Sequence, residues 1–354
     1  MWSCSYCGAA LAKSSASLPY CVNCLIEGNK EVLDSLHQIH QATPAEEELS
    51  SAIPETGSQV NCRICSRECL LARDEKGYCG LRVNRGGKLD HLAGVPSRGV
   101  LEYYFDPLPT NCVAAWVCPA KEEAPPGAKN LAVFYGACTL NCLFCQNWHY
   151  RTLTHKISPV VSAQTLAQKV NPDTSCICFF GGDPAPQLPH ALATASIAIK
   201  NYPHLKICWE TSGNIPPKLF SRVMEISYCT GGTVKFDFKA YHPNLYFALT
   251  GGSNRPMLNN FAVAAEFSRE KRINLAVAST LLVPGYITVP EIYAIASFIA
   301  AYNPYTPYSL LGFHPQYRMR DLPPTSRKEA DSCLFAAQEA GLYNVHLANR
   351  HLLI

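Results

Sequence analysis

The spacing of the cysteines constrains this chain more than any other feature of its sequence. The 354 residues include 18 cysteines, and most of them are separated by only two or three residues. Such spacings are typical of metal ligands in a reducing compartment, whereas disulfide frameworks belong to secreted chains. Cys4 and Cys7 stand where a secretion signal would carry a basic start and an apolar run. We therefore expect a cytoplasmic, metal-binding protein.

The overall composition sets three further limits. Apolar residues make up 48% of the chain, which is enough to form a sizeable core. No apolar run reaches the roughly 18 residues of a membrane-spanning helix, so we expect no membrane partner. The formal charge of +3 does not favour a nucleic-acid partner.

The composition divides the chain into four stretches. Residues 1–27 form a short knuckle of paired cysteines, similar to a zinc ribbon, and residues 28–56 form a helical linker. Residues 57–129 are a cysteine-rich module and connector with little periodicity. Residues 130–354 alternate between apolar runs and amphipathic stretches.

This alternation in residues 130–354 predicts strands and helices in turn, and therefore an α/β fold with a parallel sheet. About six or seven strand–helix units are too few for a closed eight-stranded barrel. We expect an open, partial (β/α)6-like barrel. The predicted strands cover residues 130–137, 176–180, 205–209, 233–238, 273–283, 309–313 and 345–347.

A loop with three cysteines follows the first predicted strand of that barrel. It reads Cys138-Thr-Leu-Asn-Cys142-Leu-Phe-Cys145, a C-x3-C-x2-C spacing. Three thiolates can hold three irons of a cubane, which leaves the fourth iron open to an external ligand. No further cysteine follows until Cys176. The alternative is a plain metal site completed by a ligand from elsewhere in the chain.

This loop, with Phe144 just before its last cysteine, resembles the radical S-adenosylmethionine (SAM) superfamily. The resemblance implies that Cys138, Cys142 and Cys145 hold a [4Fe-4S] cluster whose open iron is chelated by SAM. Reductive cleavage of SAM then gives a 5′-deoxyadenosyl radical, which abstracts hydrogen from a substrate. The resemblance also places Phe144 near the adenine of SAM.

Further motifs that resemble this superfamily stand at the ends of the predicted strands, where α/β folds place their sites. Gly181-Gly182-Asp183-Pro184 is similar to a GGEP motif that binds the SAM amino group. Glu210 and Ser212, in Trp209–Gly213, resemble a segment that contacts the SAM ribose. Asp237 and Lys239 resemble the D-x-K element of pyruvate formate-lyase activating enzymes, beside the SAM carboxylate.

Three more segments extend the resemblance. Thr250–Asn254 is similar to a T-G-x-x-N turn, and Val283–Gly285 to a V-P-G strand end. His314 stands where the family has a SAM-proximal histidine; the alternative is a structural, hydrogen-bonded histidine. The cysteine-rich lead-in, the string from Cys142 to Trp148 and Phe313–Tyr317 resemble the AmmeMemoRadiSam group most.

Two cysteine modules precede the barrel. The pairs Cys4/Cys7 and Cys21/Cys24 suit tetrahedral zinc, and a rubredoxin-like iron fits the same ligands. The second module, which could hold zinc or a second iron–sulfur cluster, consists of Cys62, Cys65, Cys69 and Cys79. Its many arginines and lysines compensate thiolate charge or, alternatively, face an acidic partner or RNA.

The other seven cysteines receive no assigned role. Cys112 and Cys118 are two more possible ligands. The remaining five are interpreted as small buried hydrophobic residues: Cys176, Cys178, Cys208, Cys229 and Cys333.

Together these features predict an iron-dependent oxidoreductase of the radical SAM type with an unidentified substrate. The first hypothesis is an activating or protein-modifying enzyme that acts on a polypeptide. The second is an enzyme that modifies a small molecule or a nucleotide. The third is a non-catalytic iron–sulfur carrier or adaptor, which would not need the strand-end motifs. An enzyme would also need a reductant such as ferredoxin or flavodoxin.

Overall fold

The computed structural model describes residues 2–45, 60–108, 112–118 and 120–354. Part of the predicted linker, residues 46–56, and the first residues of the module that follows it lie outside these ranges. The chain divides into two compact units. Unit 1 comprises Met1–Thr43, Leu140–Gln146 and Asp237–Ile354, and unit 2 comprises Pro44–Thr139 and Asn147–Phe236. The predicted division of the sequence into four stretches is not tested by these two units and stays a prediction.

Unit 2 is built on strands that run mostly parallel. Their order is β9-β7-β8-β10-β11-β12, and β8, β10, β11 and β12 are parallel neighbours. The bounds are β7 (Arg98–Pro107), β8 (Lys129–Tyr135), β9 (Val160–Ser162), β10 (Thr174–Gly181), β11 (Lys206–Thr211) and β12 (Val234–Asp237). The smaller strands of this unit are β3 (Val60–Asn61), β4 (Leu70–Leu71), β5 (Arg82–Arg85) and β6 (Lys88–His91).

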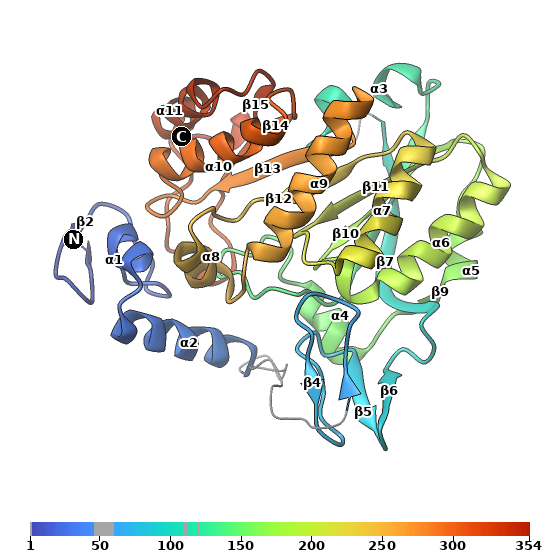
Figure 1. The fold of residues 1–354 in the computed structure, drawn as a ribbon, viewed down its shortest axis with the longest axis horizontal. Coiled ribbons are helices and arrows are strands. Elements are labelled where there is room, and N and C mark those ends of the chain that lie inside the picture. Colours follow the sequence, from blue (N-terminus) through green and yellow to red (C-terminus); the bar gives the residue numbers. More distant parts are fainter. Residues whose placement is uncertain (1, 46–59, 109–111, 119) are drawn as a thin grey trace. The chain divides into compact units, whose positions relative to one another are not determined.

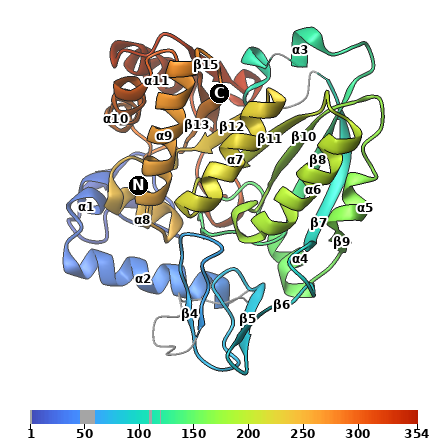
Figure 2. The same cartoon turned by 45° about the vertical axis from the view of Figure 1, so that its right-hand side comes forward.

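The helices of unit 2 include two long ones, α6 and α7, which Figures 1 and 2 show on the same side of β10 and β11. The indole of Trp209 on β11 donates to Ser227 Oγ of α7 at 2.9 Å. The bounds are α3 (Ala120–Glu123), α4 (Tyr150–Lys156), α5 (Ala163–Ala167), α6 (Leu188–Asn201) and α7 (Pro217–Thr230), with the 3-10 turns η1 (Ala115–Val117) and η2 (Ala185–Gln187).

Unit 1 continues the strand–helix alternation with three parallel strands in the order β13-β14-β15. Its strands are β1 (Trp2–Ser3), β2 (Ala10–Leu11), β13 (Ala276–Leu282), β14 (Tyr308–Gly312) and β15 (Val345–Ala348). Its helices are α1 (Val22–Glu27), α2 (Lys30–Ala45), α8 (Pro243–Thr250), α9 (Arg255–Lys271), α10 (Val289–Tyr302) and α11 (Arg327–Glu339), with the 3-10 turns η3 (Tyr317–Met319) and η4 (Arg350–Leu352).

Local sequence explains where several of these elements begin and end. Prolines stand in the first turn of α7, α8, α9 and α10, where a missing amide donor costs nothing. Ser326 and Glu329 form a capping box at the start of α11. Strand β8 is buried beyond its first residue, as expected for a parallel strand covered on both faces.

The predicted α/β class with parallel strands and a cysteine-rich N-terminal region is confirmed. The main difference lies within residues 57–129, where little regular structure was expected. Strand β7 is ten residues long and pairs antiparallel with β8. Its exposed and buried residues do not alternate regularly, so its sequence lacks the period-two signal of a half-buried strand.

The N-terminal residues pack closely against the C-terminal part of unit 1. The hydroxyl of Tyr286 donates to Leu18 O at 2.6 Å, and Asn244 Nδ2 donates to Ile26 O at 3.0 Å. Gly285 has a φ of +82°, and a Cβ at this position would lie 2.7 Å from Lys13 O. The V-P-G segment therefore needs its glycine so that the N-terminal backbone can approach.

Candidate active site

In unit 1, the predicted cluster residues Cys142 and Cys145 lie on a tight turn held by backbone hydrogen bonds. Cys145 N donates to Cys142 O at 3.2 Å. Asn141 N and Leu143 N donate to Thr250 O and Leu249 O, at 2.8 and 3.0 Å. These carbonyls belong to the last turn of α8, where carbonyl groups lack amide partners within the helix. The T-G turn at Thr250 is thus a support for the cysteine loop.

A second backbone contact fixes the same loop from the C-terminal side. Arg318 N, just after the Phe313–Tyr317 segment, donates to Leu143 O at 3.1 Å. His314 lies two residues after β14 and is exposed. The segment therefore has a structural role in addition to the role predicted for its histidine.

The predicted D-x-K pair lies beside this loop. Lys239 Nζ is 2.9 Å from Asp237 Oδ2, and Ser279 Oγ donates to Asp237 Oδ1 at 2.9 Å. The ammonium of Lys239 is 5.9 Å from the centroid of the Phe144 ring, which is buried. The structure thus brings together Asp237, Lys239 and Phe144, three residues that were each assigned to SAM from the sequence.

The charge of Lys239 is set by the same neighbours. Burial alone would lower its pKa, but the nearby Asp237, Cys142 and Cys145 outweigh burial and raise the pKa above its ordinary value. Lys239 is therefore a permanent cation beside two cysteines. This fixed positive charge suits the thiolate ligands and the SAM carboxylate that the sequence predicts here.

The turn that carries Lys239 is itself held by a buried acid. Glu291 Oε1 accepts hydrogen bonds from Tyr241 N at 2.5 Å and His242 N at 2.9 Å. Asn254 Nδ2 donates to Tyr241 O at 2.5 Å. The sequence predicted no role for Glu291, although its position in the first turn of α10 is that of an acid stabilised by the helix dipole.

In unit 2, the predicted glycine motif lies against the end of β8. Gly181 has a φ of +118°, and a Cβ there would collide with the backbone of Tyr135. A Cβ on Gly182 would collide with Ala137 O. Ala137, which directly precedes Cys138, also has a positive φ of +76°. Such backbone strain in a residue other than glycine is concentrated at functional sites.

The carboxylate of Asp183 is fully buried and connects two predicted SAM segments. It accepts hydrogen bonds from Ala185 N at 2.8 Å, Thr211 Oγ1 at 2.9 Å and Ser212 N at 3.0 Å, and also from Ser212 Oγ. Burial raises the pKa of Asp183, while these hydrogen bonds oppose the rise. The side chain therefore positions Ser212, and the motif's backbone remains the predicted contact for SAM.

Glu210 forms an ion pair with a buried lysine. Its Oε1 is 2.9 Å from Lys235 Nζ, and about a quarter of its side chain (27%) is exposed. The pair leaves Oε2 as an acceptor for the predicted ribose contact. Pro184 directly precedes η2, which begins the connection to α6.

The second cysteine module contacts the base of the cysteine loop, which the sequence did not indicate. Arg67 Nε donates to Thr139 O at 2.6 Å, and its guanidinium lies 4.2 Å from the ring centroid of Tyr78. Ser66 N donates to Asn214 O at 3.1 Å. Arg82 is buried and donates to Pro186 O at 3.2 Å. These arginines have structural partners in addition to the charge compensation expected of them.

The thiols of the second module lie near one another. The negative charge of Cys79 contributes to raising the pKa values of Cys62, Cys65 and Cys69, although burial is the largest cause for each of them. In the described chain, these thiols do not form a group with all sulfurs within 4.8 Å, unlike the N-terminal module. Zinc and a second iron–sulfur cluster both remain predictions for this module.

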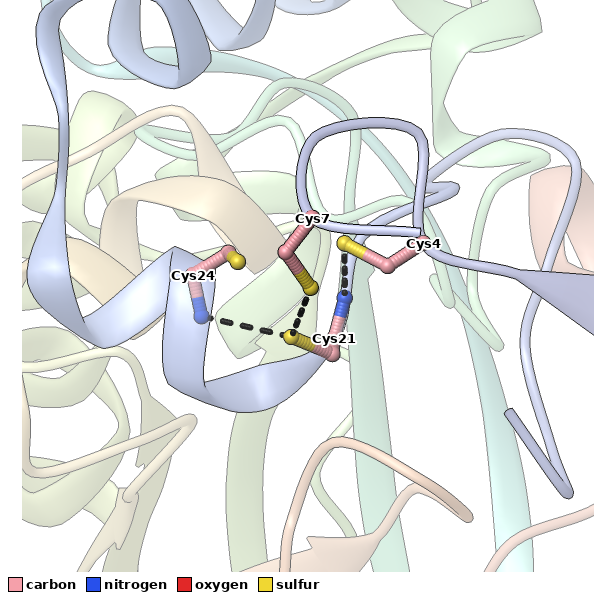
Figure 3. Close-up of side chains that lie close together, drawn as sticks. All are labelled: Cys4, Cys7, Cys21 and Cys24. Carbon is pink, nitrogen blue, oxygen red and sulfur yellow. Dashed lines mark hydrogen bonds between the residues drawn. The ribbon is translucent and has the colours of Figure 1, made fainter. Parts of the chain in front are cut away.

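The N-terminal module is compact. The sulfurs of Cys4, Cys7, Cys21 and Cys24 all lie within 4.8 Å of one another and point toward a common centre (Figure 3). Cys7 Sγ and Cys21 Sγ are 3.8 Å apart. A tetrahedral ion with bonds of about 2.3 Å to sulfur needs sulfur–sulfur distances of about 3.8 Å. The donor set and spacing therefore fit one tetrahedral ion.

The electrostatics of this module also suit a metal. Burial would raise the pKa of Cys4, but backbone hydrogen bonds from Cys7, Cys21 and Tyr6 lower it to about 6. Cys21 N donates to Cys4 Sγ at 3.3 Å. One thiolate is thus already present at neutral pH, which favours capture of a cation.

Comparison with known proteins identifies the central part of the chain. The sequence model of the radical SAM superfamily matches residues 132–299. The chain contains a radical SAM domain and is an enzyme. Such a domain implies a [4Fe-4S] cluster, SAM and a source of electrons. No helix in the described part of the chain is long and apolar enough to cross a membrane.

Relatives of this radical SAM enzyme are distant. An uncharacterised protein of Methanocaldococcus jannaschii, MJ0808, is 23% identical over 303 residues, 82% of either chain. A domain of a pyruvate-formate lyase-activating enzyme from Bacteroides vulgatus shares 18% identity with a TM-score of 0.39, covering 49% of this chain and 98% of that one. Streptococcus suis SuiB bound to SAM shares 12% identity with a TM-score of 0.39, over 63% of this chain and 47% of its own.

Proposed function

We propose that this radical SAM enzyme holds its [4Fe-4S] cluster on Cys138, Cys142 and Cys145 and uses it to abstract hydrogen from a polypeptide. The observation that carries the proposal is the position of Lys239 beside Cys142, Cys145 and the Phe144 ring. When bound, the reduced cluster and SAM supply a 5′-deoxyadenosyl radical. The residues of the chain bind and orient SAM for this reaction.

Each predicted contact has a definite task in this proposal. Lys239 offers its ammonium to the SAM carboxylate, and Asp237 holds the Lys239 side chain through the 2.9 Å ion pair. Glu210 accepts hydrogen bonds from the ribose hydroxyls. The backbone carbonyls of Gly181 and Gly182 accept hydrogen bonds from the SAM amino group. Asp183 holds Ser212 and the neighbouring strand ends in position. Pro184 and His314 complete the proposed set.

The predicted effect of Lys239→Ala is a loss of SAM affinity of about tenfold or more, because a charged hydrogen bond contributes about 1.5–3 kcal/mol. Lys239→Arg keeps the charge and should recover part of that affinity. Calorimetric titration of reconstituted protein with SAM measures both. Lys328→Ala, on the exposed face of α11, is the matched control and should bind SAM as the unmodified chain does. Equal affinities for Lys239→Ala and Lys328→Ala would refute the proposed contact.

The polypeptide class of the substrate is supported by the Asp237-Phe238-Lys239 element, which resembles activating enzymes. The proposed modules on Cys4, Cys7, Cys21 and Cys24 (zinc) and on Cys62, Cys65, Cys69 and Cys79 (zinc or a second cluster) provide further surface for a macromolecule. The cytoplasm, where ferredoxin or flavodoxin can reduce the cluster, is the proposed compartment.

A fractionated lysate of the source cells tests this class. The formation of 5′-deoxyadenosine by the reduced enzyme is measured with each fraction, before and after protease treatment. We expect the stimulating fraction to be large in size and to lose its effect on protease treatment. Stimulation that survives protease but is lost on dialysis would instead identify a small molecule, and loss with nuclease would identify a nucleic acid.

A further inference from the structure

Unit 2 contains a small cavity lined by five cysteines that the sequence left without a role. The cavity has a volume of about 30 Å³. Its walls include Asn130, Thr233 and Lys235, and its cysteines are Cys112, Cys118, Cys176, Cys178 and Cys208. A space of this size admits one or two atoms the size of water, so it excludes a cubane or an organic substrate.

Strand register gathers three of these thiols on one face of the sheet. Cys178 is the direct neighbour of Cys208 across β10 and β11, and Cys176 lies two residues before Cys178, on the same face. Trp209 points toward α7 through its hydrogen bond to Ser227. Cys208, one residue earlier, therefore points to the opposite face.

The same face carries a buried cation. Phe236 packs against Phe220 of α7, with ring centroids 5.7 Å apart, so Lys235 points away from the helices. Lys235 Nζ donates to Cys112 Sγ at 3.0 Å and to Cys178 Sγ at 3.2 Å. An ammonium that donates to sulfur stabilises negative charge on that sulfur.

The remaining thiols form a second group within the cavity. Cys118, Cys176 and Cys208 all line the cavity. Burial is the largest cause that raises the pKa values of Cys176 and Cys208, and the charge of Cys118 adds to the rise for both. Cys176 Sγ donates to Asn130 Oδ1 at 3.3 Å. Cys118 is partly exposed, which gives an ion an entry path from solvent.

We propose that this cavity binds one thiophilic metal ion through Cys118, Cys176 and Cys208. Buried thiolates select soft ions such as Cu⁺, Zn²⁺ or Cd²⁺. The three thiols lose their protons on binding, and Lys235 offsets part of the resulting negative charge. The three sulfurs do not all lie within 4.8 Å of one another, so binding requires a rotation about χ1 of at least one cysteine.

The site is distinct from the proposed SAM chemistry, because its ligands precede the strand ends at which the SAM motifs stand. Cys176 and Cys208 lie in the first half of β10 and β11, respectively. Glu210 belongs to the proposed SAM site and also lies next to the cavity. It contacts Lys235 rather than one of the proposed metal ligands. The metal count can therefore change while SAM binding does not.

Cadmium binding by the full-length protein tests the proposal. The number of Cd²⁺ ions bound per chain is measured by equilibrium dialysis for the unmodified protein and for the double variant Cys118→Ser, Cys208→Ser. We expect the double variant to bind one ion fewer and to show a smaller thiolate-to-cadmium absorbance. Cys333→Ser, a buried cysteine of unit 1 on α11, should leave the count unchanged.

A single variant tests the proposal even if the double variant misfolds. Cys208→Ser alone should weaken the affinity of one Cd²⁺ ion at least tenfold while circular dichroism stays that of the unmodified chain. An unchanged ion count and unchanged affinities in the Cys208→Ser protein would overturn the proposal. If the Cys142→Ala protein no longer forms 5′-deoxyadenosine but still binds the Cd²⁺ ion assigned to the cavity, the two sites are separate.

Discussion

Replacement of Cys142 by alanine is expected to abolish the formation of 5′-deoxyadenosine from SAM and dithionite. Two thiolates remain on the loop, and two ligands do not hold a cubane against loss of iron. The fold should persist, because the loop is fixed by backbone hydrogen bonds from Asn141 and Leu143, which an alanine at position 142 leaves intact. Anaerobic reconstitution followed by chromatography of the products measures the effect.

Cys229→Ala is the matched control, since Cys229, which the sequence wrongly predicted to be buried, is an exposed residue of α7. It should cleave SAM at the rate of the unmodified enzyme. Cys138→Ala and Cys145→Ala should behave as Cys142→Ala does. Normal product from any of these three variants would exclude the proposed ligand set.

Serine at Cys4 and Cys24 is expected to remove one zinc ion per chain and to lower the temperature at which unit 1 unfolds. Each substitution removes a soft ligand from a four-sulfur group, and a tetrahedral site that keeps only two thiolates binds zinc poorly. Because the N-terminal residues pack on Tyr286 and Asn244, the loss also weakens contacts within the C-terminal part of the unit. Elemental analysis and differential scanning calorimetry measure the two effects.

Iron content should stay constant in this variant, and Cys333→Ser should retain all of its zinc. The serine substitutions remove the ion but keep the polypeptide, so the effect of losing the ion is measured alone. Deletion of residues 1–27 would remove both at once. If the unmodified protein contains iron but no zinc, the rubredoxin-like alternative replaces the zinc module.

The sequence was sufficient to predict the fold class, the radical SAM family resemblance and the motifs at the strand ends, Asp237 and Lys239 among them. Each of these depends on local signals: strand–helix alternation, a short cysteine spacing, or a motif at the end of a strand. The fold class and the radical SAM domain are confirmed, while the reaction and its substrate stay predictions. The roles of the individual cluster and SAM residues stay predictions.

Other contacts were not predictable because they depend on strand register and on residues far apart in the chain. The neighbours Cys178 and Cys208 meet only once β10 and β11 are aligned. The spacing of Cys176 and Cys178 by itself predicts that both lie on one face of a strand. Arg67 reaches Thr139 across 72 positions of sequence, and nothing local to Arg67 indicates this partner.

The way unit 1 is assembled has a consequence for the order of events during synthesis. Its three pieces are the N-terminal residues, the short cysteine loop and the C-terminal third of the chain. The side-chain Nδ2 of Asn141 in the loop donates to His40 O at 3.2 Å, and its backbone N–H donates to Thr250 O. A ribosome releases the N-terminal cysteines long before it has made Thr250 or Arg318. The first module can therefore capture its ion on the nascent chain, whereas the cysteine loop acquires its final support only when translation is nearly complete. Iron–sulfur loading would then be a late, post-translational step.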